Sequence, residues 1–237
     1  MVPRAGEPPG AQPIPRVAPL LPAGRHQIGA PAPPTSTIGL ASSGVTTAEP
    51  ALFREAVAAM NTAQVRAEIE LGPIRPPQRL APYSYALGAE VKHPDTEIVP
   101  ETSDGDAFGR LILLHDPDGS EAWDGTMRLV AYIQADLDSS EAVDPLLPEV
   151  AWSWLVDALE SRSEHVTALG GTVTATTSVR YGDISGPPRA HQLEMRASWT
   201  ATTMALDTHV QAFCEVLEHA AGLPPVGVTD LGSRSRA

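Results

Sequence analysis

An acidic cluster near the middle of the chain holds the side chains best suited to metal chemistry. Oxygen ligands recur there at short spacing, directly after a histidine, and Ca²⁺ prefers carboxylate oxygens at such spacing. The candidate metal ligands are His115, Asp116, Asp118, Glu121 and Asp124. These residues are typical either of a divalent-ion site or of an acidic turn that needs no ion.

The spacing of this cluster departs from the twelve-residue calcium loop. Counted from Asp116, the fifth position is Ser120 instead of Asp or Asn, Gly119 comes two places early, and the twelfth position is Met127 instead of a bidentate glutamate. A turn of the Asp-Pro-Asp-Gly type explains the same residues, because Pro presets φ and Gly tolerates the left-handed region. We therefore favour the turn, and we expect no metal and no organic cofactor.

Cys214 is the only thiol in the chain, and its setting argues against nucleophilic catalysis. His209 and His219 each lie five residues away, which on a helix turns them by about 140° from the cysteine. A free cysteine on an apolar helix face is usually a small buried hydrophobe. The chain also contains no G-x-S-x-G, Walker or H-E-x-x-H motif. We assign no catalytic residue and favour a non-catalytic protein, although an enzyme using two carboxylates as acid and base stays open.

Two tryptophans offer a surface for a partner. Trp152 and Trp154 point about 200° apart on a helix, so when one of them packs on a sheet the other faces elsewhere. A tryptophan covered by a loop fits this pattern, and so does a tryptophan at an interface, where the residue is enriched at hot spots. Trp152 and Trp154 are the candidates for binding a protein partner or a second copy of the chain.

The charge balance restricts the class of partner. The 237 residues include 29 acidic and 16 basic side chains, a net charge of −13, and fourteen carboxylates between Asp95 and Glu149 face only two bases, Arg110 and Arg128. Nucleic acids and anionic membranes bind basic patches, so we expect neither as a partner. No run reaches the roughly 18 apolar residues of a membrane span, and the first residues lack the apolar core of a secretory signal. These features predict a cytoplasmic protein.

Composition divides the chain near residue 50. Residues 1–49 contain ten prolines and six glycines without apolar periodicity, which predicts a disordered tail, and residues 227–237 are predicted to be a second disordered tail. Residues 50–226 alternate between helix-like and strand-like apolar periods and form one predicted domain. Its first helix carries an apolar stripe of Leu52, Phe53, Ala56, Val57 and Met60.

The predicted element order is helix, four strands, helix, two strands, helix. Short connections between the strands favour hairpins, so we expect a single α+β domain with a mostly antiparallel sheet of about six strands and three helices. The apolar run Leu111–Leu114 predicts a central strand covered on both faces, and Gly222 ends the last helix. The predicted strands span residues 65–71, 83–91, 111–114, 127–135, 173–179 and 193–199.

Several long motifs resemble a known family. They are PPQRLAPYSYAL at 76–87, LLHDPDGSEAWDGTMRLV at 113–130, DPLLPEVAWSWLVDALE at 144–160 and AGLPP at 221–225. Together they resemble an actinobacterial family known as domain of unknown function 3000, over residues 50–226. The resemblance implies an actinobacterial source and a cytoplasmic setting, and it implies no activity, cofactor or catalytic residue. The element order alone is similar to that of small acidic secretion chaperones, which bind partner chains as dimers and place three strands before the middle helix.

The sequence therefore favours a non-catalytic, acidic, cytoplasmic binding or regulatory domain that engages a protein partner. The alternative is a divalent-ion-dependent enzyme or ion-binding domain that uses the acidic loop at 115–124.

The first prediction concerns this loop. Because it lacks the bidentate glutamate and the regular spacing of a calcium loop, calorimetric titration with Ca²⁺, Mg²⁺, Zn²⁺ and Mn²⁺ should show no binding tighter than about millimolar. Micromolar heats that vanish in the Asp118→Ala variant would contradict this prediction.

Overall fold

Six antiparallel strands form one sheet in the order β1-β2-β3-β4-β6-β5. The computed structural model describes residues 49–91, 107–162, 165–183 and 189–225, so the two predicted tails lie outside the described residues apart from Glu49. The α+β class and the predicted order of elements are confirmed. The strands are β1 (Ile69–Pro73), β2 (Tyr83–Val91), β3 (Ala107–Ser120), β4 (Gly125–Asp136), β5 (Val166–Val179) and β6 (Arg189–Ala201), and the helices are α1 (Ala51–Met60), α2 (Leu147–Arg162) and α3 (Leu206–Ala220).

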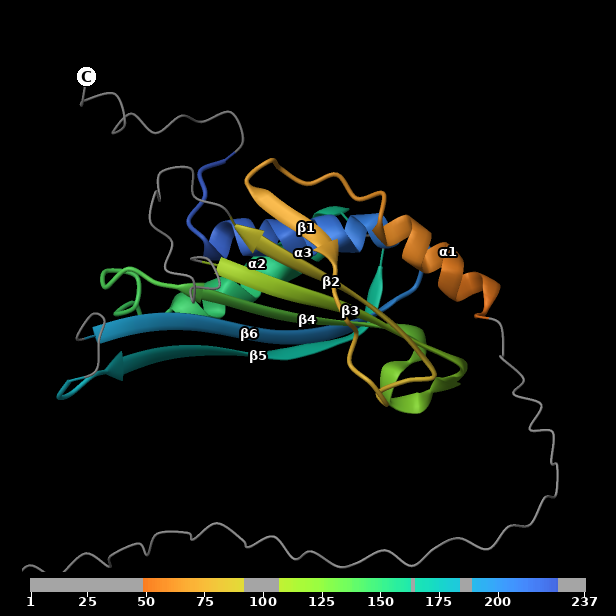
Figure 1. The fold of residues 1–237 in the computed structure, drawn as a ribbon, viewed down its shortest axis with the longest axis horizontal. Helices are drawn as coiled ribbons and strands as arrows, with labels where there is room; N and C mark the ends of the chain where they lie inside the picture. Colours follow the sequence, from red (N-terminus) through yellow and green to blue (C-terminus); the bar gives the residue numbers. More distant parts are fainter. Residues whose placement is uncertain (1–48, 92–106, 163–164, 184–188, 226–237) are drawn as a thin grey trace, which may run out of the picture. The chain divides into compact units, whose positions relative to one another are not determined.

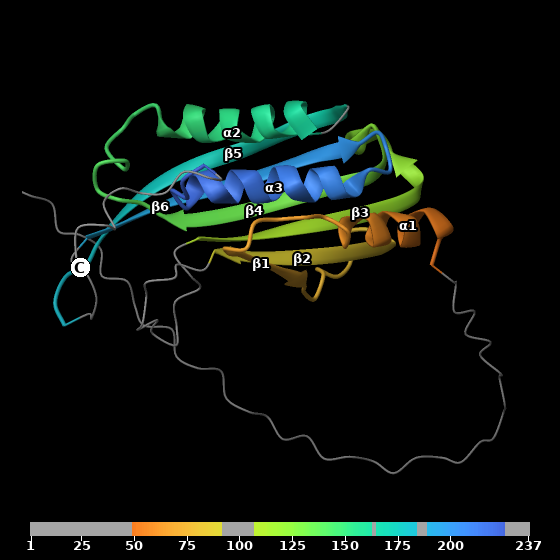
Figure 2. The same cartoon turned by 90° about the horizontal axis from the view of Figure 1, so that it is seen from above.

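All three helices pack on the same face of the sheet (Figures 1 and 2). Helix α3 contacts both α1 and α2, and it also contacts β2, β3 and β4. Alternate residues of the central strands point toward the helices and are buried, as the period of two requires. Examples are Leu111 and Leu113 on β3, Leu129 and Ile133 on β4, and Trp199 on β6. We call the other side of the sheet the open face.

Helix α3 follows the sequence prediction closely. The apolar face that was predicted to hold Cys214 is buried, and it also carries Val210, Phe213 and Leu217. The helix ends where Gly222 adopts a φ of +64°, a left-handed conformation that glycine enters without steric cost. There the N–H of Leu223 donates to the carbonyl of Glu218 at 3.0 Å, which satisfies an otherwise orphaned carbonyl.

Helix α1 departs from its predicted stripe in one residue. Phe53, Ala56 and Met60 are buried, whereas Leu52 keeps 54% of its surface exposed. The prediction that Leu52 joins the core is wrong. The three buried positions are spaced by three and four residues, and Leu52 lies one residue outside that face of the helix.

The hairpin between β3 and β4 turns later than predicted. The chain continues as strand through Asp116–Gly119, with a shift of register between His115 and Ser120. It then reverses through a short 3₁₀ turn, η1 (Glu121–Trp123), which ends at Asp124 with a φ of +54°. The predicted Asp-Pro-Asp-Gly turn is therefore an irregularity within the strand. The hairpin closes at Asp124 instead, because an aspartate also tolerates the left-handed conformation.

Other strand boundaries also differ from the prediction, and β3 and β6 each begin four residues earlier, at Ala107 and Arg189. Strand β1 begins at Ile69 instead of Val65, because the N–H of Ile69 donates to the Arg66 carbonyl in a turn that precedes the strand. Strand β5 begins at Val166 and includes the two glycines predicted to precede it.

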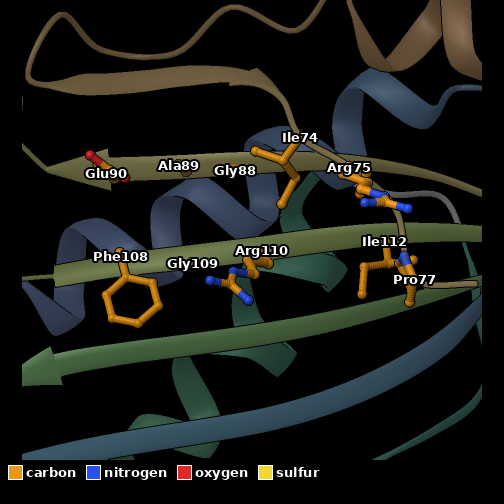
Figure 3. A pocket seen from close by; sticks show the side chains of 11 residues that line it. Ile74, Arg75, Pro77, Gly88, Ala89, Glu90, Phe108, Gly109, Arg110 and Ile112 are labelled. Carbon is orange, nitrogen blue, oxygen red and sulfur yellow. The ribbon is translucent and has the colours of Figure 1, made fainter. Parts of the chain in front are cut away.

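The run Leu111–Leu114 is central, as predicted, but helices cover only one of its faces. Leu111 and Leu113 face the helices. Leu114 points to the open face and is still buried, and its neighbour Ile112 is half-buried. Residues 74–77, between β1 and β2, lie against β2 and β3 on that side (Figure 3). The apolar run is therefore covered by helices on one face and lies beside residues 74–77 on the other.

The second prediction tests this central strand. Leu113 is fully buried between Tyr85 and Leu129 in the sheet register, so Leu113→Ala should lower the free energy of unfolding by about 2–5 kcal/mol through lost transfer energy and a residual cavity. Urea unfolding measures this change. The matched variant Leu52→Ala, on the exposed side of α1, should stay within about 0.5 kcal/mol of the parent. Equal effects of the two substitutions would show that the core is assigned wrongly.

Candidate functional site

His115, the histidine of the predicted metal candidates, lies inside the core. Only 2% of its surface is exposed. Its ring stacks on Phe53 at 6.0 Å between centroids and also meets Tyr83 at 6.0 Å, and its Nδ1 lies 3.0 Å from the carbonyl oxygen of Thr126. His115 therefore joins α1 to β2 and β3 through ring packing.

The four carboxylates of the predicted cluster stay on the β3–β4 hairpin. The Asp118 N–H donates to Oδ1 of Asp116 at 3.1 Å, a local turn contact, and Asp124 closes the 3₁₀ turn. Within the described ranges, no three His, Cys, Asp or Glu side chains come together as a group that could hold a metal ion. The five candidates are close in sequence, but their side chains do not converge on a common point. They are His115, Asp116, Asp118, Glu121 and Asp124.

The two tryptophans lie on different sides of α2, as their spacing predicts. Trp152 lies over Gly171 of β5, where a Cβ would come within 2.8 Å of the indole. Trp154 stacks on His219 of α3 with centroids 5.5 Å apart. Both side chains are half-buried. Each tryptophan therefore has a neighbour in its own chain and keeps part of its surface available to a partner.

Among the described residues, a pocket of about 470 Å³ lies on the open face. One wall is the segment 74–77, and the floor and opposite wall are β2 and β3 (Figure 3). We call it the open-face pocket. Its lining residues are Ile74, Arg75, Pro77, Ala86, Gly88, Ala89, Glu90, Phe108, Gly109, Arg110 and Ile112.

The wall is held against the sheet by one hydrogen bond and one close contact. The Ile74 N–H donates to the Ala86 carbonyl at 2.9 Å. The Ile74 side chain packs on Gly88, where an added Cβ would lie 2.8 Å from Cγ2 of the isoleucine. Because Gly88 has no side chain, Ile74 lies directly on the β2 backbone. A glycine and an alanine on this stretch of β2 leave the floor low and the pocket open.

The charges in the pocket are arranged with two cations and one anion. Arg110 projects from β3 and Arg75 from the opposite wall, both solvent-exposed (Figure 3). Within the described part of the chain, neither guanidinium has an ion-pair or hydrogen-bond partner. Glu90 lies at the far end, where it pairs in register with Phe108. An anion in the pocket could accept hydrogen bonds from either arginine, and a donor group could bind to Glu90.

An aromatic pair extends the pocket across the open face. The rings of Phe108 on β3 and Tyr132 on β4 lie 6.0 Å apart, and the Arg196 guanidinium from β6 lies 5.7 Å from the Tyr132 centroid. The Tyr132 hydroxyl lies 3.0 Å from Oε2 of Glu194. Partial burial, together with the hydrogen bond to Glu194, raises the pKa of Tyr132, so the phenol stays neutral. The extension adds an aromatic surface beside Arg110, with the Arg196 guanidinium over its outer ring.

Three residues of the pocket were not predicted from the sequence as site residues: Arg75, Phe108 and Arg110. One signal was present, because Arg110 and Arg128 are the only bases among fourteen carboxylates, and both project from the open face. The Arg128 guanidinium forms hydrogen bonds within the chain, donating to the Ser198 hydroxyl at 2.7 Å and to the Ala168 carbonyl at 2.9 Å. Arg75 lies outside the strands, and only the path of residues 74–77 over the sheet brings it near Arg110.

The groups with strongly shifted pKa values in the core are structural. Burial, with a smaller effect of Glu218, raises the pKa of the Cys214 thiol to about 12, so it remains protonated and a poor nucleophile. Burial lowers the pKa of His209 from 6.5 to about 4, and Asp207 opposes this shift weakly. The neutral His209 accepts a hydrogen bond at Nδ1 from the Trp199 indole at 3.2 Å. Both residues lie away from the open-face pocket.

The fold and the pocket define a domain with helices on one face of an antiparallel sheet and a pocket on the other. The chain belongs to the family described as "Protein of unknown function (DUF3000)", which matches residues 49–229. Neither the comparison with curated proteins nor the comparison with solved structures gave a match. Among the described helices, none has the length and apolar character needed to cross a membrane.

The third prediction follows from the buried histidine. The folded state disfavours protonated His209. The free energy of unfolding therefore has its full value above pH 6.5, as far as this group is concerned, and falls as the pH drops toward 4. The shift corresponds to about 3 kcal/mol over this range. His209→Asn keeps an acceptor and does not titrate, so the fall in unfolding free energy between pH 6.5 and 4 should become shallower, as measured by urea unfolding. His165→Asn, at an exposed position, should keep the parental profile; a parental profile in His209→Asn would contradict the assignment.

Proposed function

We propose that this protein is a non-catalytic, acidic binding domain that engages a protein partner, and that the open-face pocket receives an extended acidic segment of that partner. The observation behind the proposal is that two arginines, Arg75 and Arg110, line one pocket and have no ion-pair or hydrogen-bond partner among the described residues. A regulatory role through the bound partner follows from this mode of action.

The chemistry of the lining selects the occupant. A guanidinium presents donors in a planar fork that matches a carboxylate, so Arg75 and Arg110 can each bind an Asp or Glu side chain of the segment. Ile74, Phe108 and Ile112 offer apolar contact to a neighbouring side chain. Glu90, at the far end, can accept a hydrogen bond from a backbone N–H of the same segment. The preferred segment therefore carries a carboxylate next to an apolar residue.

The charge of the rest of the chain sharpens this selectivity. Residues 1–49 carry a net charge of +1, so the remainder carries −14. An acidic partner is repelled by most of such a surface and attracted where unpaired arginines gather, which favours a single docking position. Because Arg75 and Arg110 are exposed, the attraction is screened by salt and weakens at high ionic strength.

Three further points complete the proposal. The high pKa of Cys214 and the burial of His209 and His115 support a non-catalytic role, since these groups are not presented to a substrate. The resemblance in the family motifs supports a cytoplasmic setting. The resemblance in the family motifs, with fifteen arginines against the single Lys92, supports an actinobacterial source.

The fourth prediction tests the pocket directly. Selection of random peptides on the full chain should enrich segments with Asp or Glu beside an apolar residue. For one selected peptide, calorimetry should show Arg110→Gln or Arg75→Gln weakening binding about tenfold or more, because each removes a charge-assisted hydrogen bond. Replacing the peptide's carboxylate by its amide should have a similar effect, and that loss should not add to the loss in the Arg110→Gln variant.

The matched control is Arg79→Gln, which removes the same charge from the segment between β1 and β2 but lies outside the pocket lining. Its affinity should stay within about twofold of the parent, since only long-range charge is lost. Selection of basic or uncharged peptides, or equal effects of all three arginine variants, would reject the pocket as the site.

A further inference from the structure

The two edges of the sheet are built differently. Strand β1, at one edge, has five residues, carries Glu70 and ends at Pro73, and short edges with charge and proline resist pairing with another strand. Strand β5, at the other edge, has fourteen residues with no charged side chain and no proline (Figures 1 and 2). Among the described residues β5 pairs with β6 alone, so its second side lacks a strand partner.

The usable part of this edge is continuous. The register with β6 is interrupted between Thr167 and Gly170. There Ala168 has a φ of +50°, and its carbonyl accepts a hydrogen bond from Arg128. From Gly170 to Val179 the pairing is regular, and these ten residues span about 33 Å. The interruption separates the start of the strand from one continuous, regularly paired stretch, Gly170 to Val179.

The composition of the ladder determines which partner can meet it. Two copies of a chain with net charge −13 repel each other, so a surface without carboxylates favours their association. Strand β5 is such a surface. Its side chains between Gly170 and Val179 are mostly threonine and small apolar residues, and most of them are exposed. Threonine pairs on neighbouring strands stabilise a sheet.

We infer that the β5 edge pairs antiparallel with the β5 edge of a second copy of this chain, which joins two six-stranded sheets into one. An antiparallel pairing centred on Thr174 keeps the helices of both copies on the same side. It places Thr174 opposite its own equivalent, Thr172 opposite Thr176, and Val173 opposite Ala175. The interface is self-complementary, as two-fold symmetry requires.

Helix α2 adds side-chain area to this interface. Trp152 lies over Gly171, at the β5 edge, and remains half-exposed. In the centred pairing Gly171 lies opposite Thr177 of the second copy, so the exposed part of Trp152 meets the incoming strand. A buried tryptophan contributes more area than any other side chain of such an interface.

The fifth prediction is tested by sedimentation equilibrium of the full chain. The expected result is a monomer–dimer equilibrium with a dissociation constant on the order of micromolar, in keeping with a small interface. Added salt should tighten it, because screening reduces repulsion between the acidic bodies. Thr174→Lys should raise the dissociation constant about tenfold or more, since two like charges then meet at the centre. Thr174→Ser and Thr126→Lys, the latter on an exposed β4 position, should leave it unchanged.

A second measurement keeps the inference falsifiable if a lysine variant misfolds. Thr174→Cys should give a covalent dimer with a short thiol crosslinker, whereas Thr126→Cys and the parent, whose Cys214 is buried, should not. A monomer at about 100 μM protein overturns the inference, because such an interface should then be populated. So does a dimer that Thr174→Lys leaves intact. Thr174→Lys should retain binding of the acidic peptide, so failure of the dimer leaves the open-face pocket as an independent question.

Discussion

Burial of one sheet face beneath three helices is the interaction on which this domain depends. Leucine, methionine and tryptophan side chains from four strands meet α3 at the centre of that face, and fully burying each large side chain contributes about 1.5–3 kcal/mol. The arrangement fixes which alternate residues of every strand are apolar. It also leaves the opposite face without a helical layer, so the open face must be stabilised by other means.

Three local devices stabilise the open face, and together they create the candidate site. Residues 74–77 cross it and cover β2, which encloses the pocket. Arg128 bonds to neutral oxygens of β5 and β6 and ties the far side of the sheet together. Tyr132, Glu194 and Arg196 form a hydrogen-bonded, stacked group between these regions. Arg75 and Arg110 form no hydrogen bond or ion pair among the described residues, and this observation is the basis of the proposed anion site.

Local patterns predicted what local physics controls. The stripe of α3, its end at Gly222, the alternation of β2 and the class of fold all follow from periods of 3.6 and 2 and from glycine's backbone freedom. The late hairpin turn was missed because Asp-Pro-Asp-Gly and the sequence around Asp124 both satisfy turn geometry, and cross-strand pairing decides between them. That Arg75 and Arg110 line the same pocket was not predictable, since it depends on where residues 74–77 lie over the folded sheet. The exposure of β5 likewise depends on strand order, which a single sequence does not specify.

The net charge relates the pocket to the β5 edge. Repulsion between acidic bodies opposes every encounter that lacks a compensating feature, so it removes non-specific contacts from most of the surface. Unpaired arginines provide that compensation for an acidic segment, and an uncharged strand reduces the repulsion for a second copy. The pocket lies on β2 and β3, whereas β5 is separated from them by β4 and β6. An acidic segment can therefore bind at the pocket while the edge is paired, and a sheet continued through β5 would present two such pockets on one common face.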